Sequence, residues 1–346
     1  MQRSILGRTD LKVSRVCLGT MTYGEQNTEA EGHAQMDMAV DHGVNFFDTA
    51  ELYAIPPKPD TFGDTERIIG TWFKARGNRD QIVLATKITG RSDMPWFRKA
   101  GGSTRITPAQ IDEAVEGSLN RLQTDYIDLY QIHWPDRAYA GFGFHVYADY
   151  PDDYISFAET LQALQRHVDK GSIRHIGVSN ESAWGVMSFL AAAERDGLPR
   201  IVSIQNAYNL VNRCFEGALA EVALREQVGL LAYSPLAQGY LSGKYRDGAL
   251  PAGSRKALFN RMQRYETPEG QGAINRYLDL AKEHGITPEA LALKFTDTRP
   301  FVTSTIIGAT TLDQLKANLA AFDLTWSDDL EAAITALHIR QPNPCP

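Results

Sequence analysis

Residues 107–133 read TPAQIDEAVEGSLNRLQTDYIDLYQIH and contain one helix and one strand of the repeating pattern that decides the fold. Thr107 and Pro108 form a favourable N-cap and first-turn pair. The apolar residues that follow recur at helical spacing, at Ile111, Val115, Leu119 and Leu122. The pattern therefore predicts a helix over residues 107–122 and a strand over residues 127–133.

The same alternation continues on both sides of this segment. Two strands at residues 2–6 and 12–16, joined by Gly7–Asp10, are expected to form a hairpin at the start of the chain. The strands expected after it span residues 16–19, 44–47, 82–88, 127–133, 173–178, 201–205, 229–234 and 305–307. The expected helices span residues 28–42, 64–76, 107–122, 154–168, 182–195, 215–226, 267–284, 311–322 and 327–337.

About eight strand–helix units in alternation predict an α/β fold, a parallel sheet closed into a (β/α)8 TIM barrel. No composition break or Gly/Ser linker divides the chain, so residues 1–346 are expected to form a single domain. The longest irregular stretches, 54–63, 89–106, 134–152 and 235–266, all follow expected strands. Because such loops form the catalytic face of a barrel, we expect a substrate pocket there.

Composition and charge exclude several classes of protein. Hydrophobic residues make up 43% and charged residues 22% of the chain, which excludes a disordered chain. The net charge of −7 gives no general attraction for nucleic acid or for an anionic membrane surface, so neither is expected as a partner. The oligomeric state is left open, and an oligomer is compatible with the sequence.

The cysteines and the N-terminus indicate a compartment. Cys17, Cys214 and Cys345 cannot all pair within one chain and form no C-x-x-C motif, which favours a reducing environment. The first ten residues, MQRSILGRTD, are too polar for a signal peptide, and no segment approaches the ~20 apolar residues needed to cross a bilayer. We therefore expect a cytoplasmic protein.

Four polar residues stand at or just beyond the ends of neighbouring strands. Asp48 ends NFFD, Tyr53 ends DTAELY, Lys87 interrupts IVLATKI and His133 ends YIDLYQIH. Taken singly, such residues are more often helix caps, packed aromatics or satisfied polar groups. Lys87 is the exception, because a lysine near a core needs a paired charge, which Asp48 would supply.

This set of residues suits the protonation of a carbonyl oxygen. The free pKa of tyrosine, near 10, is too high for easy proton release at neutral pH, and a nearby ammonium lowers it. We therefore expect Lys87 to lower the pKa of Tyr53 and Asp48 to hold Lys87 in place. His133 would orient the substrate oxygen. A cofactor must supply the hydride, because no side chain donates one.

The motifs around these residues resemble the aldo-keto reductase superfamily over nearly the whole chain, particularly its bacterial Tas-type and potassium-channel β-subunit branches. They occur in order and at expected strand ends: LGTMTYGEQ (18–26), FFDTAELY (46–53), ATK (85–87), DLYQIHWP (128–135), IRHIGVSN (173–180), IQNAYN (204–209), LLAYSPL (230–236), GYLSGKY (239–245) and IIGATTLDQLKAN (306–318). The resemblance implies a barrel that reduces an aldehyde or ketone with NADPH, Tyr53 being the general acid and Asp48, Lys87 and His133 its partners.

The resemblance also implies the cofactor contacts. Thr20 and Met21 would line the nicotinamide pocket next to Asp48, and Tyr233 would stack on the ring. The residues implied to bind the nicotinamide carboxamide are Ser179, Asn180 and Gln205. Those implied along the pyrophosphate and other phosphates are Ser234, Pro235, Leu236, Gln238, Gly239, Lys244 and Arg255. The adenosine end would be held by Gly308, Thr310, Gln314 and Asn318, and Gln26 matches a cofactor-contacting glutamine of the channel-subunit branch.

The sequence departs from the family at the adenosine end. Many members carry an arginine where Gln314 stands and a glutamate where Ala317 stands. The lost arginine weakens the case for strict NADP preference, but Lys244, Arg255 and the Thr310 hydroxyl still favour NADPH over NADH. The long loops suggest a pocket lined by Trp134, Phe142, Phe144 and Tyr147, although aromatics in a loop often pack on each other.

The sequence lacks the motifs of several other functions. The chain has no G-x-G-x-x-G and no complete P-loop, and its histidines form neither H-x-H nor H-x-x-x-H. A metal-dependent barrel hydrolase could use His133 and Asp136 as ligands, but a third ligand is missing. The alternative from a different class is a catalytically weak, nucleotide-binding barrel that senses redox state through a protein partner.

Overall fold

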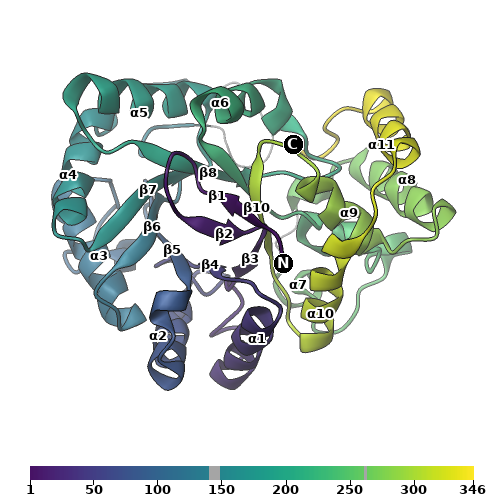
Figure 1. Cartoon of the computed structure of the whole chain (residues 1–346), viewed down its shortest axis with the longest axis horizontal. Helices are drawn as coiled ribbons and strands as arrows, with labels where there is room; N and C mark the ends of the chain where they lie inside the picture. Colours follow the sequence, from purple (N-terminus) through teal and green to yellow (C-terminus); the bar gives the residue numbers. More distant parts are fainter. Residues whose placement is uncertain (140–148, 261–262) are drawn as a thin grey trace.

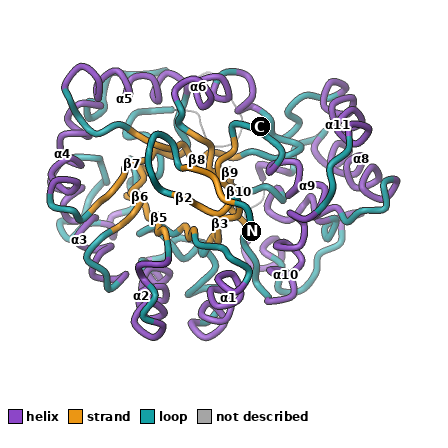
Figure 2. Tube along the Cα trace, in the orientation of Figure 1, coloured by secondary structure: helices purple, strands orange, loops and turns teal. Residues whose placement is uncertain are grey.

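A closed barrel of eight parallel strands forms the centre of the protein, as the sequence predicts (Figures 1 and 2). The computed structural model describes residues 1–139, 149–260 and 263–346. Around the barrel the strands follow in chain order, and the last one pairs with the first. They are β3 (Val16–Gly19), β4 (Phe46–Asp48), β5 (Val83–Ile88), β6 (Ile127–Ile132), β7 (Ile173–Ser179), β8 (Ile201–Ala207), β9 (Gly229–Tyr233) and β10 (Val302–Ile307).

Helices surround the barrel, as Figure 2 shows. The helices of the described residues are α1 (Glu29–Asp41), α2 (Asp64–Arg76), α3 (Pro108–Leu122), α4 (Phe157–Asp169), α5 (Ala183–Asp196), α6 (Leu219–Glu226), α7 (Arg255–Phe259), α8 (Gly270–Glu283), α9 (Pro288–Asp297), α10 (Leu312–Ala320) and α11 (Asp328–Arg340). In Figure 2, α8 and α11 stand outside α9 and farther from the strands. Among the described residues, no helix is both long and apolar enough to cross a membrane.

The N-terminal hairpin closes one end of the barrel. Strands β1 (Arg3–Ile5) and β2 (Lys12–Ser14) pair antiparallel, which confirms the expected hairpin, and Figure 1 shows them across the barrel opening. Leu6 and Val13 pack with Phe46 and Leu129 inside the barrel. Since the hairpin plugs the end at which the strands begin, the opposite end is left for a site.

Side-chain caps fix several helix starts where the sequence predicts them. The Thr107 hydroxyl accepts a hydrogen bond from the Gln110 amide at the start of α3. Thr28 and Glu31 form a reciprocal capping box at the start of α1. These contacts satisfy main-chain N–H groups that have no partner within the helix.

Some details of the expected helices were wrong. The pattern does not predict α9, because its buried residues point in several directions and leave no clear apolar stripe. The helix expected over 215–226 breaks into a short turn and α6, because Ala218 leaves helical geometry. The stretch 235–266, expected to be irregular, contains α7, which the Ser254 hydroxyl caps.

Helices α2 and α3 pack closely at Gly70. A Cβ atom on Gly70 would lie 2.4 Å from the carbonyl oxygen of Arg121 and 2.8 Å from the carbonyl carbon of Leu122. We expect Gly70→Ala to lower the free energy of unfolding by about 1–3 kcal/mol, because backbone atoms must shift. Thermal denaturation of the purified variant would measure the loss.

Gly272, on the exposed face of α8, supplies the matched control. The nearest atom to a Cβ there is 3.6 Å away, on the flexible Arg276 side chain. Gly272→Ala should raise stability by up to about 1 kcal/mol through the better helix propensity of alanine. A Gly70→Ala variant as stable as wild type would show that the two helices can separate at no cost.

Candidate active site

The candidate site lies where the barrel strands end. Asp48 is the last residue of β4, Lys87 lies in β5, and His133 directly follows β6. Tyr53 stands on the segment after β4, and its main-chain N–H donates to the Ala50 carbonyl. A cavity of about 1290 Å³ is lined by Asp48, Tyr53 and His133, while Lys87 lies fully buried behind them.

A buried ion pair joins two of these strands. The Lys87 Nζ atom lies 2.6 Å from Asp48 Oδ2 and 2.7 Å from the Thr49 carbonyl oxygen. Burial acts to lower the pKa of Lys87, but the negative charge and the hydrogen bond of Asp48 act to raise it, and the net shift of the pKa is upward. Lys87 therefore keeps its positive charge at neutral pH.

Two glutamine amides hold the other oxygen of Asp48. Nε2 of Gln131 lies 3.1 Å and Nε2 of Gln205 lies 2.8 Å from Asp48 Oδ1. The sequence analysis does not include Gln131 in the site, although it shares the inner face of β6 with Leu129 and precedes His133 by two residues. A polar side chain on that inward face was the available signal.

Tyr53 stands over this ion pair. Its ring centroid lies 5.0 Å from Lys87 Nζ, within reach of the ammonium charge. Burial raises the pKa of Tyr53, and the charge of Lys87 lowers it by less, so the net shift is upward from 10. The prediction that Lys87 lowers the pKa of Tyr53 below its usual value is therefore wrong for the net shift, because the sequence does not show how deeply the phenol is buried.

His133 completes the group. Its ring meets the Tyr53 ring edge to face at 5.6 Å between centroids. Burial, followed by the Lys87 charge, places the pKa of His133 well below 6.5, so the imidazole is neutral at pH 7. Its buried Nδ1 atom has no hydrogen-bond partner within the described residues. A neutral imidazole beside the phenol can hydrogen-bond a ligand oxygen.

The same cavity brings together every residue to which the family resemblance assigns a cofactor contact. They are Thr20, Met21, Gln26, Asp48, Ser179, Asn180, Gln205, Tyr233, Ser234, Pro235, Leu236, Gln238, Gly239, Lys244, Arg255, Gly308, Thr310, Gln314 and Asn318. Trp134 also lines the cavity. The other aromatics suggested for it, Phe142, Phe144 and Tyr147, lie outside the described residues.

A chain of hydrogen bonds connects Tyr233, Asn180 and His133. Tyr233 Oη donates to Asn180 Oδ1 at 2.6 Å, and Asn180 Nδ2 donates to the His133 carbonyl oxygen at 2.9 Å. The Arg264 side chain donates to Tyr233 Oη at 3.3 Å and lines the cavity, although the sequence analysis does not name it. Nothing in its local sequence distinguishes Arg264 from a solvated loop charge.

The loop after β9 has a geometry that suits an anionic phosphate group. Ser234, Ala237, Gln238 and Gly239 all have positive φ angles, and a turn of this kind can direct main-chain N–H groups towards a bound anion. The Gln238 Oε1 atom is buried and has no partner within the part of the chain described. Lys244 lies beside this turn, since a Cβ on Gly239 would be 2.8 Å from its Nζ atom.

At the end of the cavity that the family resemblance assigns to adenosine, Gln314 is folded back on the preceding turn. Its Oε1 atom accepts hydrogen bonds from the Thr310 amide at 3.0 Å and the Thr310 hydroxyl at 3.1 Å. Asn318 Nδ2 donates to the Gly308 carbonyl oxygen at 3.2 Å. A phosphate bound by the Thr310 amide would therefore have to displace Gln314.

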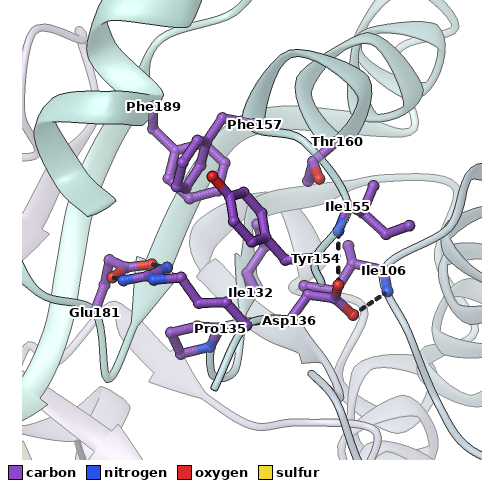
Figure 3. A pocket seen from close by; sticks show the side chains of 11 residues that line it. Ile106, Ile132, Pro135, Asp136, Tyr154, Ile155, Phe157, Thr160, Glu181 and Phe189 are labelled. Carbon is purple, nitrogen blue, oxygen red and sulfur yellow. Dashed lines mark hydrogen bonds and ion pairs between the residues drawn. The ribbon is translucent and has the colours of Figure 1, made fainter. Parts of the chain in front are cut away.

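Asp136, the second ligand of the metal-site hypothesis, is already hydrogen-bonded to other parts of the protein. Its carboxylate accepts from Arg105 at 2.8 and 2.9 Å. Figure 3 shows it between the main-chain N–H groups of Ile106 and Ile155, which donate to it at 3.2 and 2.8 Å. Asp136 thus ties together the segments that follow β5 and β6.

Comparison with known proteins identifies a family. The Aldo/keto reductase family model matches residues 15–339. The chain is 47% identical to Protein tas of Escherichia coli (strain K12), over 100% of both chains. It is 33% identical to the uncharacterized oxidoreductase YrpG of Bacillus subtilis (strain 168), over 95% of this chain and 94% of that one. A probable voltage-gated potassium channel subunit beta of Arabidopsis thaliana is 32% identical, over 94% of this chain and 92% of that protein.

The buried neutral His133 predicts a pH dependence of stability. Because its pKa in the folded protein lies below the unfolded value of 6.5, the unfolded chain binds more protons once the pH falls below 6.5. This contribution is complete above pH 6.5 and is lost as the pH falls towards the folded pKa, by up to about 1.4 kcal/mol per pH unit. Denaturant unfolding of wild type and His133→Asn between pH 5 and 8 would measure it.

His133→Asn should flatten this slope, whereas His284→Asn, on an exposed turn, should leave it as in wild type. Equal slopes in wild type and His133→Asn would mean that folding does not lower the pKa of His133.

Proposed function

The chain belongs to the aldo/keto reductase family, and from this premise we propose that it reduces an aldehyde or ketone to the alcohol with NADPH, Tyr53 being the general acid. The observation that carries the proposal is the arrangement of Tyr53 and His133 over the buried Lys87–Asp48 pair at one cavity.

The proton-donating part of the reaction belongs to this chain. With its pKa raised, Tyr53 is protonated at neutral pH and can donate its proton to a carbonyl oxygen. Lys87 stabilises the phenolate that remains, because its charge is buried, fixed by Asp48 and close to the ring. Neutral His133 holds the carbonyl oxygen in reach of Tyr53. The nicotinamide cofactor, when bound, supplies the hydride.

The residues around the cavity fit a dinucleotide. Asn180 and Gln205 would hold the carboxamide and Tyr233 the face of the nicotinamide ring. The turn at Ser234–Gly239, with Lys244 beside it, would hold the phosphates. At the adenosine end Gln314 is neutral, so we propose a preference for NADPH over NADH that is smaller than in relatives with arginine there.

A redox-sensing role through a protein partner is the weaker proposal. It draws on the relative named as a potassium channel subunit beta. Such a role needs nucleotide binding alone, and it gives no reason for a buried lysine beside a tyrosine at the barrel mouth. Turnover of a simple aldehyde with NADPH separates the two proposals.

Removing the Tyr53 hydroxyl tests the acid. Tyr53→Phe should bind NADPH as wild type does, because the ring remains, and should lose about 10²–10⁴-fold in kcat for aldehyde reduction, because the proton donor is gone. Tyr126→Phe is the control, since the Tyr126 ring packs between Arg79 and Arg174 and does not line the cavity. A Tyr53→Phe enzyme with more than half of wild-type kcat would remove Tyr53 from the mechanism.

Replacing Gln314 tests the account of cofactor choice. Gln314→Arg should tighten NADPH binding by up to about tenfold, because a guanidinium–phosphate pair is charge-assisted and the Thr310 amide is released. NADH lacks the 2′-phosphate and should gain little. Fluorescence titration of both cofactors against both proteins would measure the effect, and tighter binding of NADH than NADPH by wild type would contradict the proposed preference.

A further inference from the structure

The cavity carries an excess of positive charge, although the whole chain has a net charge of −7. Among the described residues that line it, the carboxylates are Asp48 and Glu289, and Asp48 is paired with Lys87. The lining cations are Arg91, Arg137, Lys244, Arg255 and Arg264. A cleft of one charge sign attracts ligands of the opposite sign.

The proposed cofactor contacts account for only part of this charge. Lys244 and Arg255 belong to the segments assigned to cofactor phosphates, and Arg264 contacts Tyr233. Arg91 and Arg137 lie elsewhere: Arg91 is in the segment that follows β5, and Arg137 is in the segment that follows β6. Two of the lining arginines therefore belong to the loops that follow the strands leading to Lys87 and His133, and not to the segments assigned to the cofactor.

Arg137 is already committed to a structural contact. Its two terminal nitrogens bind the Glu181 carboxylate, one of them at 2.9 Å, and one also donates to Ser182 Oγ at 3.0 Å. Its side chain is only 10% exposed and lies 5.0 Å from the Trp184 ring. A ligand anion would have to compete with a buried, bidentate partner.

Arg91 stands one indole ring away from His133. The Trp134 ring centroid lies 4.9 Å from that of His133, and Trp134 Nε1 donates to the Arg91 carbonyl oxygen at 2.7 Å. Gly90 makes this contact possible, because a Cβ there would lie 2.1 Å from the Trp134 carbonyl oxygen. The main chain of Arg91 is thus fixed against the wall of the cavity.

The guanidinium of Arg91 has capacity for a ligand. Its Nη2 atom binds the Asp153 carboxylate, and its Nε and Nη1 atoms have no hydrogen-bond partner within the described residues. Asp153 is 67% exposed and also binds Arg105. An ion pair this exposed is worth about 0–1 kcal/mol, so a carboxylate entering the cavity can replace it.

We infer that the substrate is an aldehyde or ketone that also carries a carboxylate, which Arg91 binds while the carbonyl group meets Tyr53 and His133. The inference rests on the proposed reductase function. The planar guanidinium of Arg91 can bind a carboxylate through two nitrogens, and its contact with Asp153 uses only Nη2. Between the two ends, Leu52, Met94 and Trp134 line the cavity, so the middle of the substrate is apolar.

A pair of aldehydes of nearly equal shape tests this inference. 4-Carboxybenzaldehyde carries the anion, and 4-nitrobenzaldehyde replaces it by a neutral group of similar size. The measured quantity is the ratio of their kcat/KM values, compared between proteins so that the different intrinsic reactivities cancel. Arg91→Gln should lower the ratio by at least about tenfold, mainly through the KM of the carboxylate substrate.

Two further variants make the result specific. Asp153→Asn should raise the ratio, because it removes the carboxylate that competes for Arg91. Lys58→Gln removes one positive charge from an exposed residue that pairs with Glu25 and does not line the cavity, and it should leave the ratio unchanged.

The possible outcomes distinguish a failure of the carboxylate site from a failure of the proposed reductase function. If wild type reduces both aldehydes and Arg91→Gln leaves their ratio unchanged, or Asp153→Asn lowers it, the carboxylate site is wrong and the reductase stands. If wild type reduces neither aldehyde with NADPH while it binds the cofactor, the proposed function fails and the inference fails with it.

Discussion

A single buried charge organises this barrel mouth: the ammonium group of Lys87, which has no exposure to solvent. Taking a cation out of water is costly unless a counter-charge and hydrogen-bond acceptors replace the water. Here Asp48 and the Thr49 carbonyl oxygen do so, at 2.6 and 2.7 Å. Asp48 is in turn held by the amides of Gln131 and Gln205, so one ion pair fixes side chains from four strands.

The barrel fold makes this arrangement possible, because all of its strands run parallel. Parallel strands of a closed barrel end at the same rim, so residues far apart in the chain meet there. The hairpin closes the other end with Leu6 and Val13, and the site opens into the cavity at the rim where the strands end. The loops after β5 and β6 line the part of the cavity where we propose that the substrate binds, and Asp136 and Trp134 connect them.

Much of this could be predicted from the sequence, because alternation and strand ends are local patterns. The barrel, its hairpin and the Lys87–Asp48 pair follow from period and position, and the cavity gathers the residues that the family motifs indicate. The features that the sequence could not show depend on how deeply a side chain is buried and on the direction in which it points. The net upward shift of the Tyr53 pKa comes from burial, the contact of Gln314 with Thr310 comes from one rotamer, and α9 lacks the one-sided pattern that announces a helix.

The most direct test of this account is the kcat of Lys87→Met for aldehyde reduction with NADPH, measured beside Lys74→Met on the exposed face of α2. NADPH titration and circular dichroism on the same samples show that each variant is folded and binds the cofactor. The account predicts a loss of at least about 100-fold in Lys87→Met, because the phenolate of Tyr53 loses the buried cation beside it, and wild-type turnover in Lys74→Met. A folded, NADPH-binding Lys87→Met enzyme with a kcat within twofold of wild type would contradict it.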